Sequence, residues 1–148
     1  CLPSRHFSGR GPLNRNSTLW SSWAIKSPGA KIYFSGDSGY GGHFKKIGKN
    51  HGPFDISLLD CGQYNLAWKY VHMFPFEAIL AAKELRTKYF MPIHWGGFTL
   101  ALHPWDEPVI ESIKLAEESG LSYITPGIGE VLSKNTINKP YLKWWEEY

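Results

Sequence analysis

Three short segments carry side chains that could bind a metal ion at points where β-strands are expected to stop. His6 lies in Pro-Ser-Arg-His-Phe-Ser, Asp37 in Ser-Gly-Asp-Ser-Gly-Tyr and His94 in Ile-His-Trp-Gly. Each stands beside a glycine or a proline, or follows a β-branched or aromatic run, and this context marks the start of a loop. Two imidazoles and a carboxylate are suitable ligands for zinc, which lowers the pKa of a bound water to about 7.

Each of these signals also has an ordinary structural alternative. A single loop histidine is more often structural, and an aspartate between glycines, such as Asp37, often only forms a turn. Open α/β sheets, however, bind ligands beyond the carboxyl ends of their strands, where several such loops meet. The metal site is therefore a prediction that three loops, distant along the chain, fold together.

The elements that must position these loops alternate between strands and helices. Residues 1–17 are expected to form an irregular loop. Strands are expected at 19–25, 31–34, 55–60, 89–93, 121–125 and 130–132, and helices at 42–49, 75–85 and 107–119. In the second helix the apolar residues that recur near a period of 3.6 are Phe76, Ile79, Leu80 and Leu85, and in the third the expected buried stripe is Val109, Ile110, Ile113 and Ala116 or Leu115. The turn Ser-Pro-Gly-Ala joins the first two strands as a hairpin, and Pro92 indicates an edge position near the end of the fourth. A hairpin followed by crossover helices predicts an α/β fold with a mixed sheet.

Composition narrows the classes of protein that this chain can represent. It has 148 residues, of which 43% are hydrophobic, enough for one domain with a buried core. The 16 basic and 13 acidic residues form no long run of one sign, so nothing indicates nucleic-acid binding. Cys1 and Cys61 have no CxxC spacing, and no apolar run reaches the length of about 18 residues that a membrane span needs. We expect a cytoplasmic location, with peripheral membrane contact as an open alternative.

Longer motifs occur around the three candidate ligands in a recognisable order. They read Pro-x-x-His-aromatic at 3–7, Leu-Trp-x-Ser-Trp at 19–23, Gly-Asp-Ser-Gly-Tyr at 36–40 and Ile-His-Trp-Gly at 93–96. This order resembles the second half of a metallo-beta-lactamase-fold hydrolase, in the branch of N-acylphosphatidylethanolamine-hydrolysing phospholipase D. The resemblance implies the C-terminal half of an αββα sandwich over residues 1–134, with 135–148 as a C-terminal tail.

The resemblance also implies an activity and roles for particular residues. It identifies His6, Asp37 and His94 as zinc ligands in a phosphodiesterase that acts on N-acylphosphatidylethanolamine-like phospholipids, with Asp37 bridging two ions in the intact fold. His72 matches a family histidine near the substrate phosphate, where an imidazole stabilises the developing negative charge. His72 and Asp37 are thus the expected catalytic residues. The structural alternative for His72 is a helix-entry histidine bonded to backbone.

Two departures from the family pattern limit what the chain can do alone. Asp60 occupies a position where family members often have proline, which adds a carboxylate near the metals. The His-x-His-x-Asp-His motif, which supplies four ligands in this fold, is absent. Since the residues after Cys1 already belong to the expected site, we expect a fragment that holds one zinc ion or none and is inactive alone. Its exposed sheet should pair with the missing N-terminal half or with a second copy.

Other interpretations stay open at this point. The same fold and metals could serve a lactone or ester hydrolase, because fold does not fix chemistry. A third interpretation is a catalytically incomplete fragment that acts by association. In the tail, tryptophans beside lysines at 139–145 are typical of a bilayer interface, or they dock on the domain. His43, His51 and His103 match nothing in the family pattern and are expected to be exposed.

Overall fold

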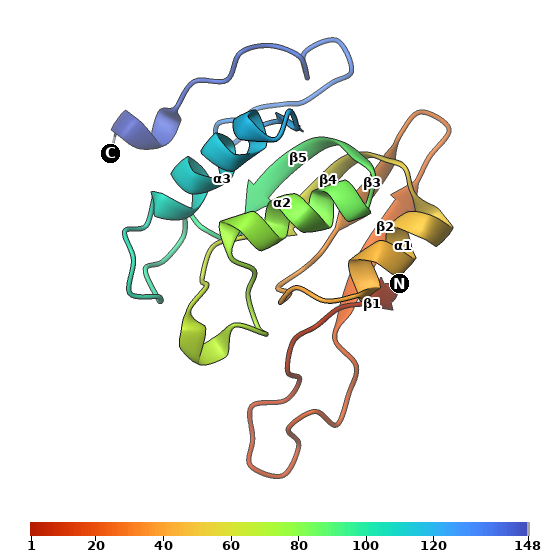
Figure 1. Ribbon diagram of the computed structural model, residues 1–148, viewed down its shortest axis with the longest axis vertical. Coiled ribbons are helices and arrows are strands. Elements are labelled where there is room, and N and C mark those ends of the chain that lie inside the picture. The colour runs from red at the N-terminus through yellow and green to blue at the C-terminus, as the bar shows by residue number, and fades with distance from the viewer. Residues whose placement is uncertain (148) are drawn as a thin grey trace.

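Six strands form one mixed sheet, in the order β1-β2-β3-β4-β5-β6, in a computed structural model that describes residues 1–147 (Figure 1). The strands are β1 (Leu2–Pro3), β2 (Ser21–Lys26), β3 (Lys31–Phe34), β4 (Phe54–Asp60), β5 (Thr87–Ile93) and β6 (Ser122–Tyr123). The first three pair antiparallel, and the pairs from β3 to β6 are parallel. The predicted α/β fold with a mixed sheet is confirmed.

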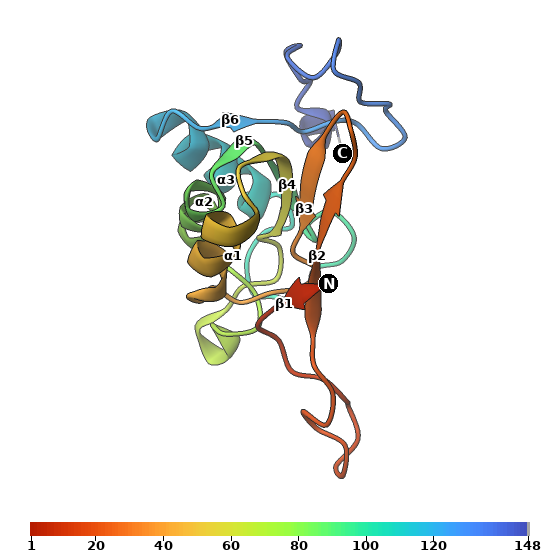
Figure 2. The same cartoon turned by 90° about the vertical axis from the view of Figure 1, so that its right-hand side faces the viewer.

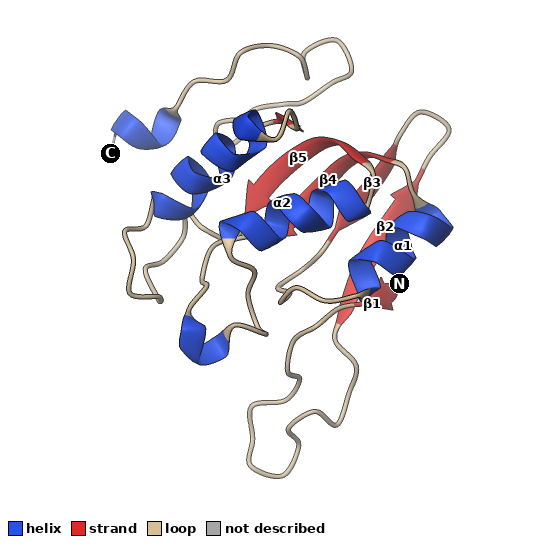
Figure 3. Cartoon of the chain, in the orientation of Figure 1, coloured by secondary structure: helices blue, strands red, loops and turns tan. Residues whose placement is uncertain are grey.

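Three α-helices connect the parallel strands, and all lie on one side of the sheet (Figure 2). They are α1 (His43–His51), α2 (Pro75–Glu84) and α3 (Glu107–Glu118), with short 3-10 helices η1 (Leu66–Trp68) and η2 (Trp144–Glu147) (Figure 3). Helix α2 begins where expected because Pro75 occupies its first turn and Glu77 accepts a hydrogen bond of 3.0 Å from the Phe74 backbone N–H.

The core fills the space between the helices and the facing side of the sheet. Its largest fully buried side chains include Tyr33, Phe44, Phe54, Leu59, Phe90, Leu85 and Val109. On α3 the expected stripe holds for Val109, Ile113 and Ala116, but Ile110 is 44% exposed and was predicted wrongly. Because Ile110 directly follows Val109, the helix turns it about 100° away from the core.

Helix α2 differs more from the sequence prediction. Phe76 and Leu80 are exposed, and the buried positions are Ala78, Ala81 and Ala82 beside Ile79. Since α2 packs against α1, α3 and the sheet, small side chains on its inner face allow a close approach to them. Of the apolar residues expected to recur along this helix, Ile79 and Leu85 are buried, whereas Phe76 and Leu80 lie on the exposed side.

None of the three α-helices lies over the opposite side of the sheet, which residues 125–130, Leu132 and Trp144 border in part (Figure 2). We call it the open face; it consists of alternate residues of four strands: Trp23, Ile25, Ile32, Phe34, Ile56, Leu58, Met91 and Ile93. All of these side chains are at least partly exposed, and Ile25 is 56% exposed. Parallel sheets normally have both faces covered, so an apolar face that stays partly exposed is unusual for a sheet of this kind.

The last part of the sheet is shorter than expected. Tyr89 and Phe90 pair with β6, whereas Pro92 lies past the end of that pairing and needs no partner on that side. The strand predicted at 130–132 is absent, because a turn closed by Gly127 and Glu130 occupies this part of the chain. At the other end, Leu2–Pro3 pairs with β2 although the sequence predicted a loop there.

The C-terminal tail returns to the domain instead of standing clear of it. Trp145 is 2% exposed, and the rings of Trp144 and Trp145 lie 5.2 and 5.7 Å from that of Trp95. The docked-tail interpretation therefore describes these two tryptophans, whereas the boundary between 134 and 135 stays a prediction, with Tyr148 outside the described residues. None of the described helices combines the length and the apolar character needed to cross a bilayer.

Candidate metal centre

One cavity of about 450 Å³ receives the side chains of His6, Asp37, His72 and His94. It lies beyond the carboxyl ends of the parallel strands, because Asp37 follows β3 and His94 directly follows β5. Parallel strands end at the same edge of a sheet, so loops that are distant along the chain meet there. The expected ligands thus face a common space, and their roles as ligands stay predictions.

Hydrogen bonds join the loop that carries His6 to the loop that carries Asp37. The Gly39 N–H donates to the Arg5 carbonyl at 2.8 Å, and the Arg5 N–H donates to the Ser38 hydroxyl at 3.3 Å. The Trp20 indole N–H donates to the Asp37 carbonyl at 2.9 Å. Asp37 is thus fixed through its own backbone, which leaves its carboxylate free for the cavity.

His94 is held close to Asp37 by an unusual backbone. Its Nδ1 lies 3.8 Å from Asp37 Oδ1, and its φ of 68° is in the left-handed region that residues other than glycine rarely adopt. A Cβ on Gly62 would collide with the His94 carbonyl oxygen, so only glycine allows the end of β4 to approach this closely. Backbone strain of this kind is typical of functional sites.

The His6 ring has the hydrogen-bonding pattern of a metal-binding histidine. Its Nδ1 lies 2.6 Å from the Phe7 carbonyl, which can only accept, so Nδ1 carries the proton and Nε2 keeps a lone pair. The ring stacks on Phe7 and Trp20 at centroid distances of 4.4 and 4.5 Å. Imidazole nitrogen together with the Asp37 carboxylate is a donor set that fits zinc.

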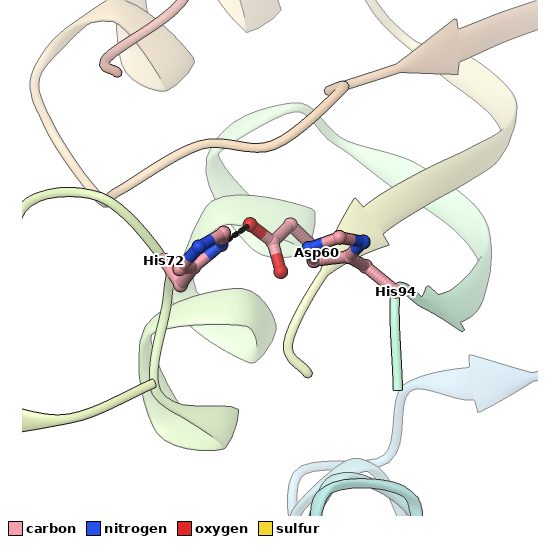
Figure 4. Close-up of side chains that lie close together, drawn as sticks. All are labelled: Asp60, His72 and His94. Carbon is pink, nitrogen blue, oxygen red and sulfur yellow. Dashed lines mark hydrogen bonds and ion pairs between the residues drawn. The ribbon is translucent and has the colours of Figure 1, made fainter. Parts of the chain in front are cut away.

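Asp60 and His72 form a buried pair next to His94 (Figure 4). Asp60 Oδ2 lies 2.7 Å from His72 Nδ1, and the rings of His72 and His94 stack at 5.1 Å. Each of the three side chains offers one ligand atom within 4.8 Å of the others, a compact group that, among residues 1–147, does not include His6 or Asp37. The sequence identified Asp60 as an extra carboxylate at a strand end. It did not indicate that Asp60 pairs with His72.

The remaining walls of the cavity combine one cation with apolar side chains. Arg10 contributes a guanidinium, and the apolar walls comprise Phe7, Trp20, Trp68, Val71 and Leu100. Gln63 links the loop before His72 to the loop after His94, since its amide bonds the backbone of Phe98, Leu100 and Ala101 at 2.7, 3.1 and 3.1 Å. Of these residues, only Phe7 and Trp20 belong to the sequence motifs around the candidate ligands.

Burial decides whether the other titratable side chains of the chain can take part in chemistry. Burial raises the pKa of the Cys61 thiol to about 12, with a Ser112 hydrogen bond acting in the opposite direction, so Cys61 stays a neutral thiol. His51 is exposed as expected, but His43 and His103 are half-buried, and that expectation was wrong for them. Both pack on aromatic rings, of Phe44 and Tyr64 respectively.

Comparison with known proteins defines the family. The model of the "Beta-lactamase superfamily domain" family matches residues 1–95, and the chain belongs to this superfamily of metal-dependent hydrolases. The structure of the metallo hydrolase Igni18 from Ignicoccus hospitalis superposes with a TM-score of 0.66 at 22% identity, covering 88% of this chain and 49% of Igni18. The predicted half of a metallo-beta-lactamase fold is therefore confirmed.

Within the superfamily, the chain is a protein similar to N-acylphosphatidylethanolamine-hydrolysing phospholipase D, as the sequence motifs indicated. It is 35% identical over 141 residues to such an enzyme of Caenorhabditis elegans, and 47% identical over 148 residues to an uncharacterized protein of Mycobacterium tuberculosis. The matches cover 88% and 98% of this chain but only 39% of each relative. It is also 55% identical over 95 residues to "Outer membrane protein RomA" of Klebsiella pneumoniae, covering 64% of this chain and 71% of RomA.

Proposed function

We propose that the intact protein carrying this chain is a zinc-dependent phosphodiesterase that cleaves N-acylphosphatidylethanolamine-like phospholipids. The observation that carries the proposal is the mixed character of one cavity, where candidate metal ligands and Arg10 lie opposite aromatic and aliphatic walls. A phospholipid has the same division between an anionic phosphate and apolar chains. The similarity to the nematode phospholipase D supports the same substrate class.

In this proposal each residue has a separate task. His6, Asp37 and His94 would hold the metal, which when bound would supply a Lewis acid and lower the pKa of a bound water. His72, protonated at Nε2 as well as at Nδ1 when the anionic phosphate is bound, donates a hydrogen bond from Nε2 to a phosphoryl oxygen as negative charge develops, and Arg10 attracts the phosphate. Trp20, Trp68 and Leu100 receive the apolar part of the lipid and exclude water from the reacting bond. Three candidate ligands fall short of a two-metal set, so the chain alone should bind one ion or none and be inactive.

We also propose that the open face packs against the upstream part of the intact protein. Its eight residues are core-type side chains that all remain at least partly exposed, although residues 125–130, Leu132 and Trp144 border part of this face, and exposed apolar patches mark interaction sites. The relatives extend well beyond the matched part, since this chain covers 39% of the nematode enzyme. A homodimer through the open face is the competing outcome, which sedimentation of the chain with and without the upstream half decides.

Peripheral membrane contact follows from the proposed substrate, which resides in a bilayer. Support comes from exposed apolar side chains at the cavity, where Leu100 is 70% exposed and Leu19, beside Trp20, is 98% exposed. Cosedimentation of the intact protein with phospholipid vesicles measures this contact. A Leu19→Ser, Leu100→Ser variant should bind less, with Val131→Ser as a control on an exposed apolar residue that does not line the cavity.

The test of the proposed function compares Asp37→Ala with Asp55→Ala in the intact protein. Asp55 is an exposed aspartate on β4 that does not line the cavity, so its removal controls for loss of a carboxylate. Asp37→Ala should lose bound zinc, measured by atomic emission, and at least about a hundredfold in phosphodiester hydrolysis. Equal activity of Asp37→Ala and the parent refutes the metal role. Faster turnover of lactones than of phosphodiesters across a substrate panel refutes the proposed bond specificity.

A further inference from the structure

The Asp60 side chain is fully buried and receives hydrogen bonds from three directions. Oδ2 accepts from the Ser38 backbone N–H at 2.9 Å and lies 2.7 Å from His72 Nδ1, while Oδ1 accepts from the Gly62 backbone N–H at 3.2 Å. Two of these partners are backbone N–H groups, which can donate a hydrogen bond but cannot accept one. A carboxylate, which only accepts, satisfies all three when His72 Nδ1 carries its proton.

The His72 ring is consequently fixed in both orientation and tautomer. Its Nδ1 points to Asp60 in the interior, and His72 also lines the cavity with only 9% of its side chain exposed (Figure 4). The rings of His6 and His94 lie 5.6 and 5.1 Å away and restrict rotation further. The ring nitrogen left for the cavity is therefore Nε2.

We propose that Asp60 is a positioning residue, which holds His72 with Nδ1 protonated toward the interior and Nε2 presented to the substrate. Asp60 itself touches no substrate. Its position as the last residue of β4 makes this orientation a property of the sheet, because strands are more rigid than the loop that carries His72. The kinetic part of the proposal rests on the proposed function, whereas the orientation of the ring does not.

Asparagine at this position cannot reproduce the three contacts. If its oxygen replaces Oδ2, its amide nitrogen faces the Gly62 N–H, and two donors oppose each other. If the amide is reversed, its nitrogen faces both the Ser38 N–H and the His72 Nδ1–H. In the first orientation the neutral amide oxygen still accepts from His72 Nδ1–H, but more weakly than a carboxylate does, and in the reversed orientation His72 must change tautomer. Asp60→Asn therefore weakens or reverses the preference for the Nδ1-protonated ring while hardly changing side-chain volume.

The first experiment observes the His72 ring directly in the intact, metal-loaded protein. Long-range ¹H–¹⁵N NMR spectra distinguish a ring protonated on Nδ1 from one protonated on Nε2. The parent and Asp60→Glu, which keeps a carboxylate, should show the Nδ1 form, and Asp60→Asn should show a mixture or the other tautomer. An unchanged His72 signature in Asp60→Asn overturns the proposal, and circular dichroism verifies that each variant is folded.

The second experiment separates positioning from metal binding. Asp60→Asn should retain its zinc, unlike Asp37→Ala, and should lower kcat about tenfold to a hundredfold with little change in KM. In a His72→Ala background the same substitution should lower kcat no further, because its route through His72 is gone. Loss of zinc in Asp60→Asn, or full additivity with His72→Ala, overturns the proposal. If no phosphodiester is cleaved but the NMR result holds, the proposed function fails and the positioning role stands.

Discussion

The two faces of the sheet carry similar side chains but end in different surroundings. On the helix side, Tyr33 and Phe90 are fully buried beneath α1, α2 and α3. On the open face, Phe34 and Met91, their immediate neighbours along the same strands, remain partly exposed. Alternation along the strands therefore places apolar side chains on both faces of the sheet, and the three α-helices cover one of these faces. The stability of the chain should reside on the helix side.

The largest effect is expected from a matched pair of substitutions on β5. Phe90→Ala removes a fully buried ring and should lower the free energy of unfolding of this chain by about 3 to 5 kcal/mol. Met91→Ala, one residue further on the open face, should cost less than about 1 kcal/mol. Urea denaturation measures both changes. Equal losses would show that the two faces contribute alike and would break the comparison.

A charge introduced on the open face should lower the free energy of unfolding by slightly less than Phe90→Ala does. The size of this loss should depend on whether the upstream half is present. Met91→Asp in the isolated chain leaves the new carboxylate in contact with water, whereas cover from the upstream half would bury it. We expect a loss of about 2 to 3 kcal/mol more in the intact protein than in the chain alone. Thermal or chemical unfolding of the parent and of Met91→Asp, measured in the isolated chain and again in the intact protein, gives this difference. If it is near zero, the upstream half does not cover this face.

The reactivity of Cys61 tests whether the helix side opens. Burial raises its thiol pKa to about 12, and Cys1 is exposed. At pH 8, Cys61 should react with a thiol reagent at least about a hundredfold more slowly than Cys1, because both its thiolate and its access are lacking. Addition of urea should bring the two rates together as the chain unfolds. Fast labelling of Cys61 in the native chain would contradict a closed helix side.

The smallest effect is the pH dependence from His43, at the start of α1 on the helix side. Burial, with a further contribution from Arg5, lowers the His43 pKa from 6.5 to about 4. Since the unfolded chain takes up the proton first, this contribution to stability is complete above pH 6.5 and declines as the pH falls toward 4. His43→Gln should flatten the stability profile in this window. A profile identical to that of the parent would contradict the assignment.

The limits of helices and strands were predicted best where a proline or a turn sequence marks them. Pro75 gave the start of α2 and Lys31–Phe34 gave β3 to the residue, because local residue types determine these limits. The side of a helix that faces the core was less predictable, as Ile110 shows, because adjacent apolar residues fit two stripes equally well. The packing of neighbouring elements decides between them, and no single segment contains that information.

The candidate site was predictable to the level of loops but not of contacts. His6, Asp37, His72 and His94 were chosen from motifs, and the shared edge of parallel strands explains why one cavity receives them. The pairing of Asp60 with His72 could not be inferred, because it depends on the path of the loop between them. That path is set by tertiary hydrogen bonds such as those of Gln63.

The tryptophan cluster around Trp95 gives the molecule a built-in optical reporter. Trp105, Trp144 and Trp145 lie with ring centroids 6.1, 5.2 and 5.7 Å from Trp95, close enough for their excited states to couple. Trp95 is bonded directly to His94, so movement of that histidine alters the geometry of the coupled indoles. Near-ultraviolet circular dichroism should therefore follow metal loading in real time, without any added dye or label.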